Sequence, residues 1–270
     1  MIPVGFAYER PDTLEGALAL LAEHGEDAKV LAGGHSLLPV MKLRLAAPEL
    51  VIDIGRLSEL RYLRVEGDEL AIGAGSRHHD LETLDVVAAE APLLAAVART
   101  VGDPQVRHRG TLGGSLAHAD PASDLPAAIL ATGGTIVLRG PRGERRVPIT
   151  EFFTGLFSTA AEPDELVVEV RVPRTGSSGW AYEKFTRRAN DWAIVGVAVV
   201  DGRVGLVNMG STPLRASATE AALADGASTA AAAALADQGT DPPADLAGTP
   251  AYRRHLVRVL TRRALTSATR

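Results

Sequence analysis

Two pairs of adjacent glycines, Gly33-Gly34 and Gly113-Gly114, are the residues best suited to hold a ligand. They lie within AGGHSLL (32–38) and TLGGSLAHADPASD (111–124). A bound diphosphate needs backbone N–H donors close to its oxygens, and residues without a Cβ let the chain approach closely and adopt positive φ. A lone glycine pair is usually a turn, but two such loops predict a ligand with phosphate and hydroxyl groups, whose identity the residues leave open. The loops also carry hydrogen-bonding side chains: His35, Ser36, Thr111, Ser115 and His118.

A serine hydrolase is the first alternative. The segment Gly34-His35-Ser36-Leu37-Leu38 resembles a nucleophile elbow, and a later aspartate and His255 follow in the chain order of a triad. The last position of the elbow should be glycine rather than Leu38, and with Pro39 so near we expect no helix directly after Ser36. A second alternative is a scaffold subunit that keeps the fold without catalysis, and the intact glycine pairs argue against it.

Three other groups of residues could carry chemistry. Gly73-Ala74-Gly75 hints at a dinucleotide fingerprint, but its sixth position is His78. The cluster His78-His79-Asp80 could bind a metal, although solvated imidazoles at a helix start are the simpler interpretation. His108 and His118 flank the second glycine pair and could contact a phosphate or only hold the loop. We therefore predict no metal site and name no general acid or base.

Composition restricts the chemistry further. The 270 residues contain no cysteine, which excludes a thiolate zinc site, a cysteine nucleophile and an iron-sulfur cluster bound by this chain. Redox chemistry would need an organic cofactor. The formal charge of −5 argues against nucleic-acid binding. The start of the sequence shows no signal peptide and no stretch is long enough to span a bilayer, so we expect a cytoplasmic protein.

The elements that position the first loop form a small α/β unit. Asp12 or Thr13 can cap a helix whose apolar positions share one face, and Gly25 can end it. Residues 28–31 predict a buried strand that runs directly into Gly33, and residues 50–54 predict a second strand.

The second loop belongs to a longer unit. Residues 62–65 and 70–72 predict a hairpin, and residues 92–101 predict a helix. A second helix is expected over 125–131, with Ser123 or Asp124 as its cap. Two strands are expected over 135–138 and 166–172. The segment from 102 to 124 is rich in glycine, proline and histidine, so we expect it to be irregular. Residues 173–179 are the best candidate for a linker.

An antiparallel meander follows the linker. Residues 180–185, 193–200 and 203–208 predict strands, with Asp201-Gly202 as a two-residue hairpin turn. From Pro213 onward the sequence predicts alanine-rich helices interrupted by a loop over 239–248. The last helix has an apolar stripe and a basic run, which we interpret as a solvated face or a subunit contact: Arg253, Arg254, Arg258, Arg262 and Arg263.

Three longer motifs resemble one family. AGGHSLLPVMKLR (32–44), VGDPQVRHRGTLGGSLAHADPASDLPA (101–127) and YEKFTRRANDWAIVGVA (182–198) are similar, in this order, to the FAD-binding medium subunit of molybdenum hydroxylases. The pattern is nearest to the aerobic carbon monoxide dehydrogenase type within the xanthine dehydrogenase family. The resemblance covers nearly the whole chain.

The resemblance implies an α+β fold in three parts. Residues 1–57 and 58–173 would form a two-part FAD-binding domain of the vanillyl-alcohol-oxidase (PCMH) type. Residues 174–270 would form a C-terminal α+β domain of the carbon monoxide dehydrogenase flavoprotein type, with an antiparallel sheet and helices.

The resemblance also implies a set of FAD-contacting residues. The adenine-diphosphate channel would be lined by the two glycine loops: Lys29, Val30, Leu31, Ala32, Gly33, Gly34, His35 and Ser36, and Thr111, Leu112, Gly113, Gly114 and Ser115. Further contacts would come from Val101 at the flavin side and from Asp124, Leu166 and Lys184. The family often has Asn at the position of Ser115, which keeps a hydrogen-bonding side chain.

Two of the implied contacts have an equally simple structural interpretation. Trp192 matches a position where the family places an aromatic residue near the isoalloxazine ring, but it could instead be a core tryptophan that opens a strand. Lys184 could be a surface lysine on an edge strand.

The function implied by the resemblance is electron transfer. Electrons from a large molybdopterin-binding subunit would pass through the iron-sulfur clusters of a small 2Fe-2S subunit to FAD on this chain and then to an external acceptor. The assembly would be a heterotrimer or a dimer of heterotrimers, and the absence of cysteine suits this division of roles. The substrate (carbon monoxide, a purine, an aldehyde or another heterocycle) and the acceptor (a quinone, NAD or a dye) stay open.

Overall fold

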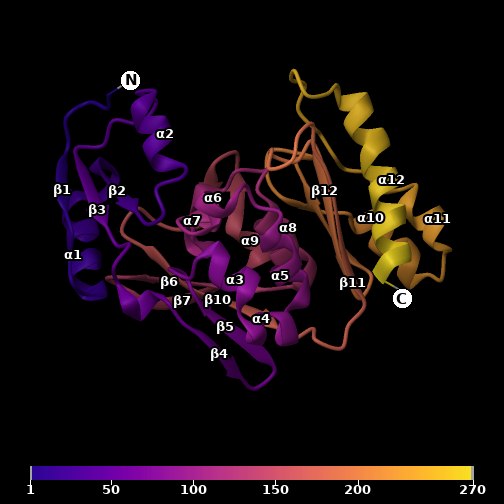
Figure 1. Cartoon of the computed structure of the whole chain (residues 1–270), viewed down its shortest axis with the longest axis horizontal. Coiled ribbons are helices and arrows are strands. Elements are labelled where there is room, and N and C mark those ends of the chain that lie inside the picture. Colours follow the sequence, from indigo (N-terminus) through magenta and orange to yellow (C-terminus); the bar gives the residue numbers. More distant parts are fainter. Residues whose placement is uncertain (1, 269–270) are drawn as a thin grey trace.

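The three larger β-sheets, with their helices, lie in a row along the long axis of the molecule (Figure 1). The computed structural model describes residues 2–268. The indigo N-terminal sheet and the orange C-terminal sheet lie at opposite ends, and the central sheet lies between them. This architecture confirms the predicted α+β class with an antiparallel C-terminal sheet.

The N-terminal sheet is parallel, with strand order β1-β3-β2. Its strands are β1 (Ala7–Glu9), β2 (Ala28–Leu31) and β3 (Leu50–Asp53). The short 3₁₀ turn η1 (Gly25–Asp27) precedes β2, and helix α2 (Leu37–Lys42) follows the first glycine pair. The two strands predicted here are confirmed, whereas β1 and α2 carry no clear sequence signal.

Helix α1 (Leu14–His24) forms where the sequence predicts it. Thr13 caps it by accepting a hydrogen bond from the backbone N–H of Gly16 at 3.1 Å, and Gly25 ends it with φ 50°. The buried face of α1 belongs to one apolar cluster with Leu166 and Val168 of the central sheet. The N-terminal sheet therefore shares a core with the central sheet.

The central sheet is antiparallel, with strand order β4-β5-β10-β6-β7. Its strands are β4 (Leu63–Glu66), β5 (Glu69–Gly73), β6 (Thr135–Gly140), β7 (Gly143–Pro148) and β10 (Leu166–Pro173). The predicted hairpin is confirmed, with Gly67 at φ 61° in its turn. Strand β7 and the small pair β8 (Phe153–Gly155) and β9 (Ser158–Thr159) were not predicted, because their residues are mostly exposed and lack apolar alternation.

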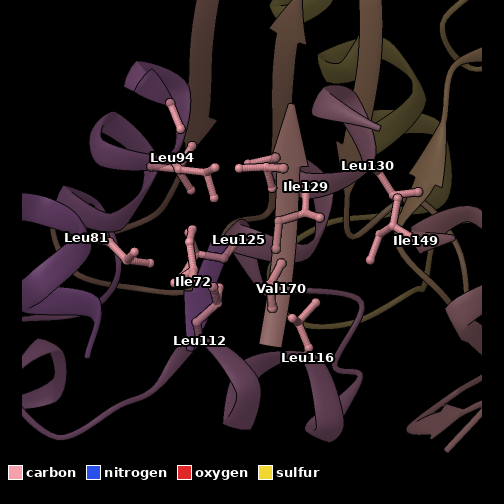
Figure 2. Close-up of a cluster of buried hydrophobic side chains, with 14 of the residues drawn as sticks. Ile72, Leu81, Leu94, Leu112, Leu116, Leu125, Ile129, Leu130, Ile149 and Val170 are labelled. Carbon is pink, nitrogen blue, oxygen red and sulfur yellow. The ribbon is translucent and has the colours of Figure 1, made fainter. Parts of the chain in front are cut away.

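Helices cover one face of the central sheet and close the main core. Leu60 of η2 (Ser58–Leu60) belongs to the core shared with the N-terminal sheet, and α6 (Pro104–Arg107) has no buried residue. The helices of the main core are α3 (His78–Thr83), α4 (Asp85–Glu90), α5 (Pro92–Arg99), α7 (Leu112–His118), α8 (Asp124–Thr132) and α9 (Ile149–Phe152). Figure 2 shows how their side chains meet those of the sheet, with Ile72 and Val170 facing Leu94, Leu125 and Ile129. All nine residues of α8 are buried, because this helix lies between the central and C-terminal sheets.

The expectation of an irregular segment from 102 to 124 is wrong. Asp103 caps α6 by accepting from the N–H of Val106 at 2.9 Å, and Pro104 occupies its first position. Thr111 caps α7 by accepting from the N–H of Gly114 at 3.1 Å. Capping and burial of α7 therefore outweigh the low helix propensity of its two glycines.

The C-terminal sheet is the predicted antiparallel meander, extended by one short strand. Its order is β11-β12-β13-β14, formed by β11 (Trp180–Phe185), β12 (Val195–Val200), β13 (Arg203–Val207) and β14 (Leu214–Arg215). Asp201 and Gly202 both have positive φ, of 46° and 76°, as the predicted two-residue turn requires. Strand β12 is buried on both faces: Ala198 and Val200 join the core under α8, while its other valines join the core under α12.

Three helices cover the outer face of this sheet: α10 (Ser217–Ala224), α11 (Thr229–Ala233) and α12 (Pro250–Ala268). The apolar stripe of α12 is buried as predicted. The basic run is not a uniformly solvated face, because Arg253 is fully buried and donates to the carbonyl of Ile194 and, at 2.6 Å, to Asp245. Within residues 2–268, no helix is long and apolar enough to cross a membrane.

Candidate functional site

A pocket of about 960 Å³ lies where the three sheets meet. Residues from both glycine loops, from the central sheet and from the C-terminal sheet line it. All of the residues predicted to contact FAD line this pocket except Leu31 and Leu112. Leu31 ends β2 next to the pocket, and Leu112 is fully buried in the core beneath α7.

The first glycine loop turns the chain from β2 into α2. Gly34 has φ 79°, which favours glycine, and its carbonyl accepts from the N–H of Leu38 at 3.1 Å. Helix α2 begins directly after Ser36, so the expectation that no helix follows this serine is wrong. Ser36 itself has an ordinary φ of −102° rather than the strained geometry of a nucleophile elbow. His255 is exposed on α12 at the opposite end of the molecule, so these two residues form no triad (Figure 1).

Chain packing requires the first glycine of each pair. A Cβ on Gly33 would lie 2.3 Å from the carbonyl oxygen of Arg109, and a Cβ on Gly113 would lie 2.5 Å from the Cβ of Ala74. A side chain at either position would therefore meet the packed chain itself, and the contact of these glycines with a phosphate stays a prediction. Gly114 differs, because a Cβ there would meet only the capping hydroxyl of Thr111, at 2.7 Å.

Arg77 joins the second loop to the end of the N-terminal sheet. Its guanidinium donates to the carbonyl of Arg109 and, at 3.2 Å, to the carbonyl of Gly55, and its backbone forms a β-bridge with Thr111. Partial burial and the nearby cations Arg109 and Arg61 lower its pKa. The sequence analysis missed Arg77, because neither its spacing nor its neighbours distinguish it from a surface arginine.

Within the histidine cluster, His78 is a buried structural residue rather than a solvated imidazole, whereas His79 is partly exposed. His78 is buried against Gly110, its backbone N–H donates to the carbonyl of Gly110 at 3.0 Å, and its Nδ1 has no hydrogen-bond partner within residues 2–268. Burial is the largest of the effects that lower the pKa of His78 to about 4, and the nearby His35 and Arg77 contribute smaller effects in the same direction. Asp80 instead accepts two hydrogen bonds from Arg61, at 2.7 and 2.9 Å.

The other histidines lie around the second loop. His79 packs against His108 with ring centroids 4.0 Å apart, and His118 lines the pocket beside Phe157. Burial lowers the pKa of His118. Across the described residues, no group of three or more His, Cys, Asp or Glu side chains could hold a metal ion.

A buried ion pair forms the pocket wall between α8 and the C-terminal sheet. The Lys184 ammonium donates to Asp124 at 2.8 Å and to the carbonyl of Thr100 at 2.9 Å. The side chains of Lys184 and Asp124 are only 9% and 6% exposed, so Lys184 is not a surface lysine even though β11 is an edge strand. Tyr182 donates to the other carboxylate oxygen of Asp124 at 2.5 Å, a contact that the sequence analysis did not anticipate.

Trp192 lies at the rim of the pocket. Its side chain is 60% exposed and β12 begins three residues later, so the interpretation of Trp192 as a core tryptophan that opens a strand is wrong. Asn190 and Asp191 line the pocket beside it. The backbone that follows is held firmly, because Asn208 donates to the carbonyl of Ala193 at 2.9 Å.

Comparison with known families accounts for both parts of the chain. Residues 4–175 match the FAD binding domain in molybdopterin dehydrogenase, and residues 180–268 match the CO dehydrogenase flavoprotein C-terminal domain. The chain belongs to this family of flavoproteins. The resemblance inferred from the motifs is therefore confirmed, and FAD is the cofactor of this flavoprotein.

Individual relatives resemble the flavoprotein over its whole length. It is 44% identical to the carbon monoxide dehydrogenase medium chain of Hydrogenophaga pseudoflava, over 99% of this chain and 98% of the relative. A solved structure of carbon monoxide dehydrogenase from that organism superposes with a TM-score of 0.96 at 46% identity, covering 100% of this chain and 99% of the other. Quinoline 2-oxidoreductase from Pseudomonas putida 86 gives a TM-score of 0.93 at 31% identity, covering 100% and 99%.

The residues that line the pocket fit FAD. The lining runs from residues next to the N-terminal sheet, such as Ile54 and Leu57, past both glycine pairs, to Lys184 and Trp192 on the C-terminal side. A pocket of this volume that combines glycine-rich backbone with both apolar and cationic side chains suits a large ligand that carries a diphosphate between two ring systems.

Proposed function

We propose that this flavoprotein is the electron-transfer subunit of a molybdenum hydroxylase of the carbon monoxide dehydrogenase type. FAD would receive electrons from the iron-sulfur clusters of a small 2Fe-2S subunit and pass them to an external acceptor. A large molybdopterin-binding subunit would oxidise the substrate, in a heterotrimer or a dimer of heterotrimers in the cytoplasm. The observation that carries the proposal is the large pocket lined by both glycine loops, in a chain that is similar to a carbon monoxide dehydrogenase medium chain over its full length.

The proposal assigns a role to each part of the pocket. The loop after β2 and the first turn of α7 would hold the diphosphate through backbone N–H groups, because the two glycine pairs bring main-chain rather than side-chain atoms to that part of the lining. Val101, Leu166 and Trp192 would contact the rings of FAD, and Lys184 would present its ammonium to the flavin end. FAD supplies the redox chemistry, whereas this chain binds it, orients it and limits its exposure to water.

We also propose that the chain divides functionally as the sequence analysis expects, into residues 1–57, 58–173 and 174–270. The pocket draws residues from all three parts, for example Lys29, Thr111 and Lys184. Each part would therefore be needed for FAD binding.

Purification of the assembly with its co-expressed partner subunits tests the proposed function. We expect a yellow protein that releases one FAD per copy of this chain on denaturation. Carbon monoxide, added anaerobically, should bleach the flavin absorbance of the assembly, with quinoline and an aldehyde as comparison substrates. A colourless assembly, or a flavin that none of these substrates reduces, would contradict the proposal, and labelling of Ser36 by a phosphonate probe would support the hydrolase instead.

A further inference from the structure

Strand β11 presents alternate residues to two different cores. Ala181 packs in the cluster under α12, whereas Tyr182 packs against Ala127 and Val207 on the side of α8. Because side chains alternate along a strand, Lys184 points to the same side as Tyr182. Tyr182 is thus placed next to the ion pair without lining the pocket itself.

The carboxylate of Asp124 has one donor on each oxygen. Tyr182 donates to Oδ1 at 2.5 Å and Lys184 donates to Oδ2 at 2.8 Å. Burial raises the pKa of Asp124, and Lys184 and Tyr182 oppose that rise. Burial and Asp124 raise the pKa of Tyr182 well above its ordinary value, so its hydroxyl stays protonated and remains a donor at neutral pH.

Lys184 has a donor left over for a ligand. An ammonium carries three N–H donors, and the carboxylate of Asp124 and the carbonyl of Thr100 accept two of them. The direction in which the third N–H points depends on how firmly the first two are held by their acceptors. One of these acceptors is the carboxylate of Asp124, to which Tyr182 also donates.

We propose that Tyr182 is a positioning residue for FAD: its hydroxyl holds the carboxyl group of Asp124 in place, and Asp124 in turn fixes the ammonium of Lys184 at the flavin end of the pocket. This inference rests on the proposed function. It assigns a role to a side chain that does not touch the cofactor.

Loss of the Tyr182 hydroxyl should change the pH dependence of FAD binding. Among residues 2–268, the groups that shift the pKa of Asp124 are Lys184 and Tyr182, both on β11. Without the hydroxyl, burial raises the pKa of Asp124 further, so Asp124 takes up a proton at a higher pH. Lys184 then loses its anionic partner at that higher pH, and FAD is released.

The test is the Tyr182→Phe variant of the assembly purified with its partner subunits. FAD fluorescence released after incubation at each pH, and the flavin reduction potential at pH 7, are the two measurements. We expect the acid midpoint of FAD release to rise by about one pH unit, FAD to bind about tenfold more weakly at pH 7, and the potential to become more negative, because a displaced cation stabilises reduced flavin less.

Tyr62→Phe is the matched control. Tyr62 also donates to a carboxylate, Glu169, at 2.7 Å, but neither residue lines the pocket. We expect its FAD release profile and potential to equal those of the wild type. If Tyr182→Phe gives the same profile and potential as the wild type, the positioning role is wrong.

Two further outcomes are informative. A wild-type assembly without FAD would overturn the proposed function and the role of Tyr182 with it. If Tyr182→Phe does not fold, as judged by circular dichroism, Asp124→Asn decides instead, because an amide cannot take up the proton. The expected result is weaker FAD binding at pH 7 without the acid limb of release, and an unchanged acid limb would overturn the inference.

Discussion

The first glycine pair ends a strand and turns the chain, whereas the second pair lies in the first turn of a helix. His35 and Leu38 beside the first pair are exposed, while Leu112 and Leu116 beside the second are fully buried in the main core. Similar sequences therefore serve different structural purposes on the two sides of the pocket. The first loop lies nearer the surface, whereas the second is enclosed by the main core.

The largest effect should come from Gly113→Val. A branched side chain here meets Ala74 at a site enclosed by the core, so we expect the free energy of unfolding to fall by about 4 kcal/mol. Urea denaturation measures the change. Gly5→Val is the control, since nothing lies within 4 Å of a Cβ at Gly5. A Gly113→Val protein of wild-type stability that lacks only FAD would mean that the two loops are equivalent after all.

The free energy of unfolding should depend on pH through His78, which packs against Gly110 beside the second loop. The folded protein keeps His78 neutral down to about pH 4, whereas the unfolded chain binds a proton near pH 6.5. The free energy of unfolding should therefore decrease by up to about 3 kcal/mol as the pH falls from 6.5 to 4. Urea denaturation of His78→Asn over this range should show a shallower slope, and exposed His24→Asn should match the wild type. Equal slopes for all three proteins would contradict this role.

Gly33→Ala should weaken both stability and FAD binding. The added Cβ meets the backbone carbonyl oxygen of Arg109 at 2.3 Å, in a loop that is partly exposed. We expect a loss of about 2 kcal/mol in stability and about tenfold weaker FAD binding, measured by thermal unfolding and by FAD titration. Gly155→Ala, where the nearest atom lies 3.8 Å away, should change neither.

The smallest effect should come from Thr111→Ala. Loss of the N-cap of α7 should cost about 1 kcal/mol of stability. Thr13→Ala removes an equivalent cap from α1, away from the pocket, and should cost a similar amount. Only Thr111→Ala should also weaken FAD binding, because the N–H of Gly114 loses its partner next to the pocket. Equal FAD affinity in the two variants would show that the cap has no part in binding.

The sequence predicts a helix or turn correctly where the residues that specify it are close together in the chain and also suit its packing in the fold. Thr13, the apolar face of α1 and Gly25 are all close in sequence, and the turn Asp201-Gly202 specifies its own hairpin. The segment from 102 to 124 could not be predicted in this way, because its glycines indicate a loop while Thr111 and the buried Leu112 and Leu116 stabilise a helix.

The sequence motifs predicted the two glycine loops of the candidate site, but they did not predict the side chains that hold the second loop and Lys184 in place. The two glycine pairs mark the loops in the sequence, whereas Arg77 reaches a carbonyl 32 positions away and Tyr182 reaches a carboxylate 58 positions away. Contacts at such separations depend on how the sheets pack. The alternation of Tyr182 and Lys184 along one strand was the only available signal, and it gains meaning only once α8 is known to lie on that side.

The alternation along β11 also limits how this protein can be divided. One face of the strand belongs to the core under α12, and the other supplies Lys184 to the pocket. A one-residue insertion in β11 would exchange these faces, and removal of the strand would leave the pocket open on one side. The C-terminal sheet therefore cannot be exchanged for another without changing the pocket wall that contains Lys184.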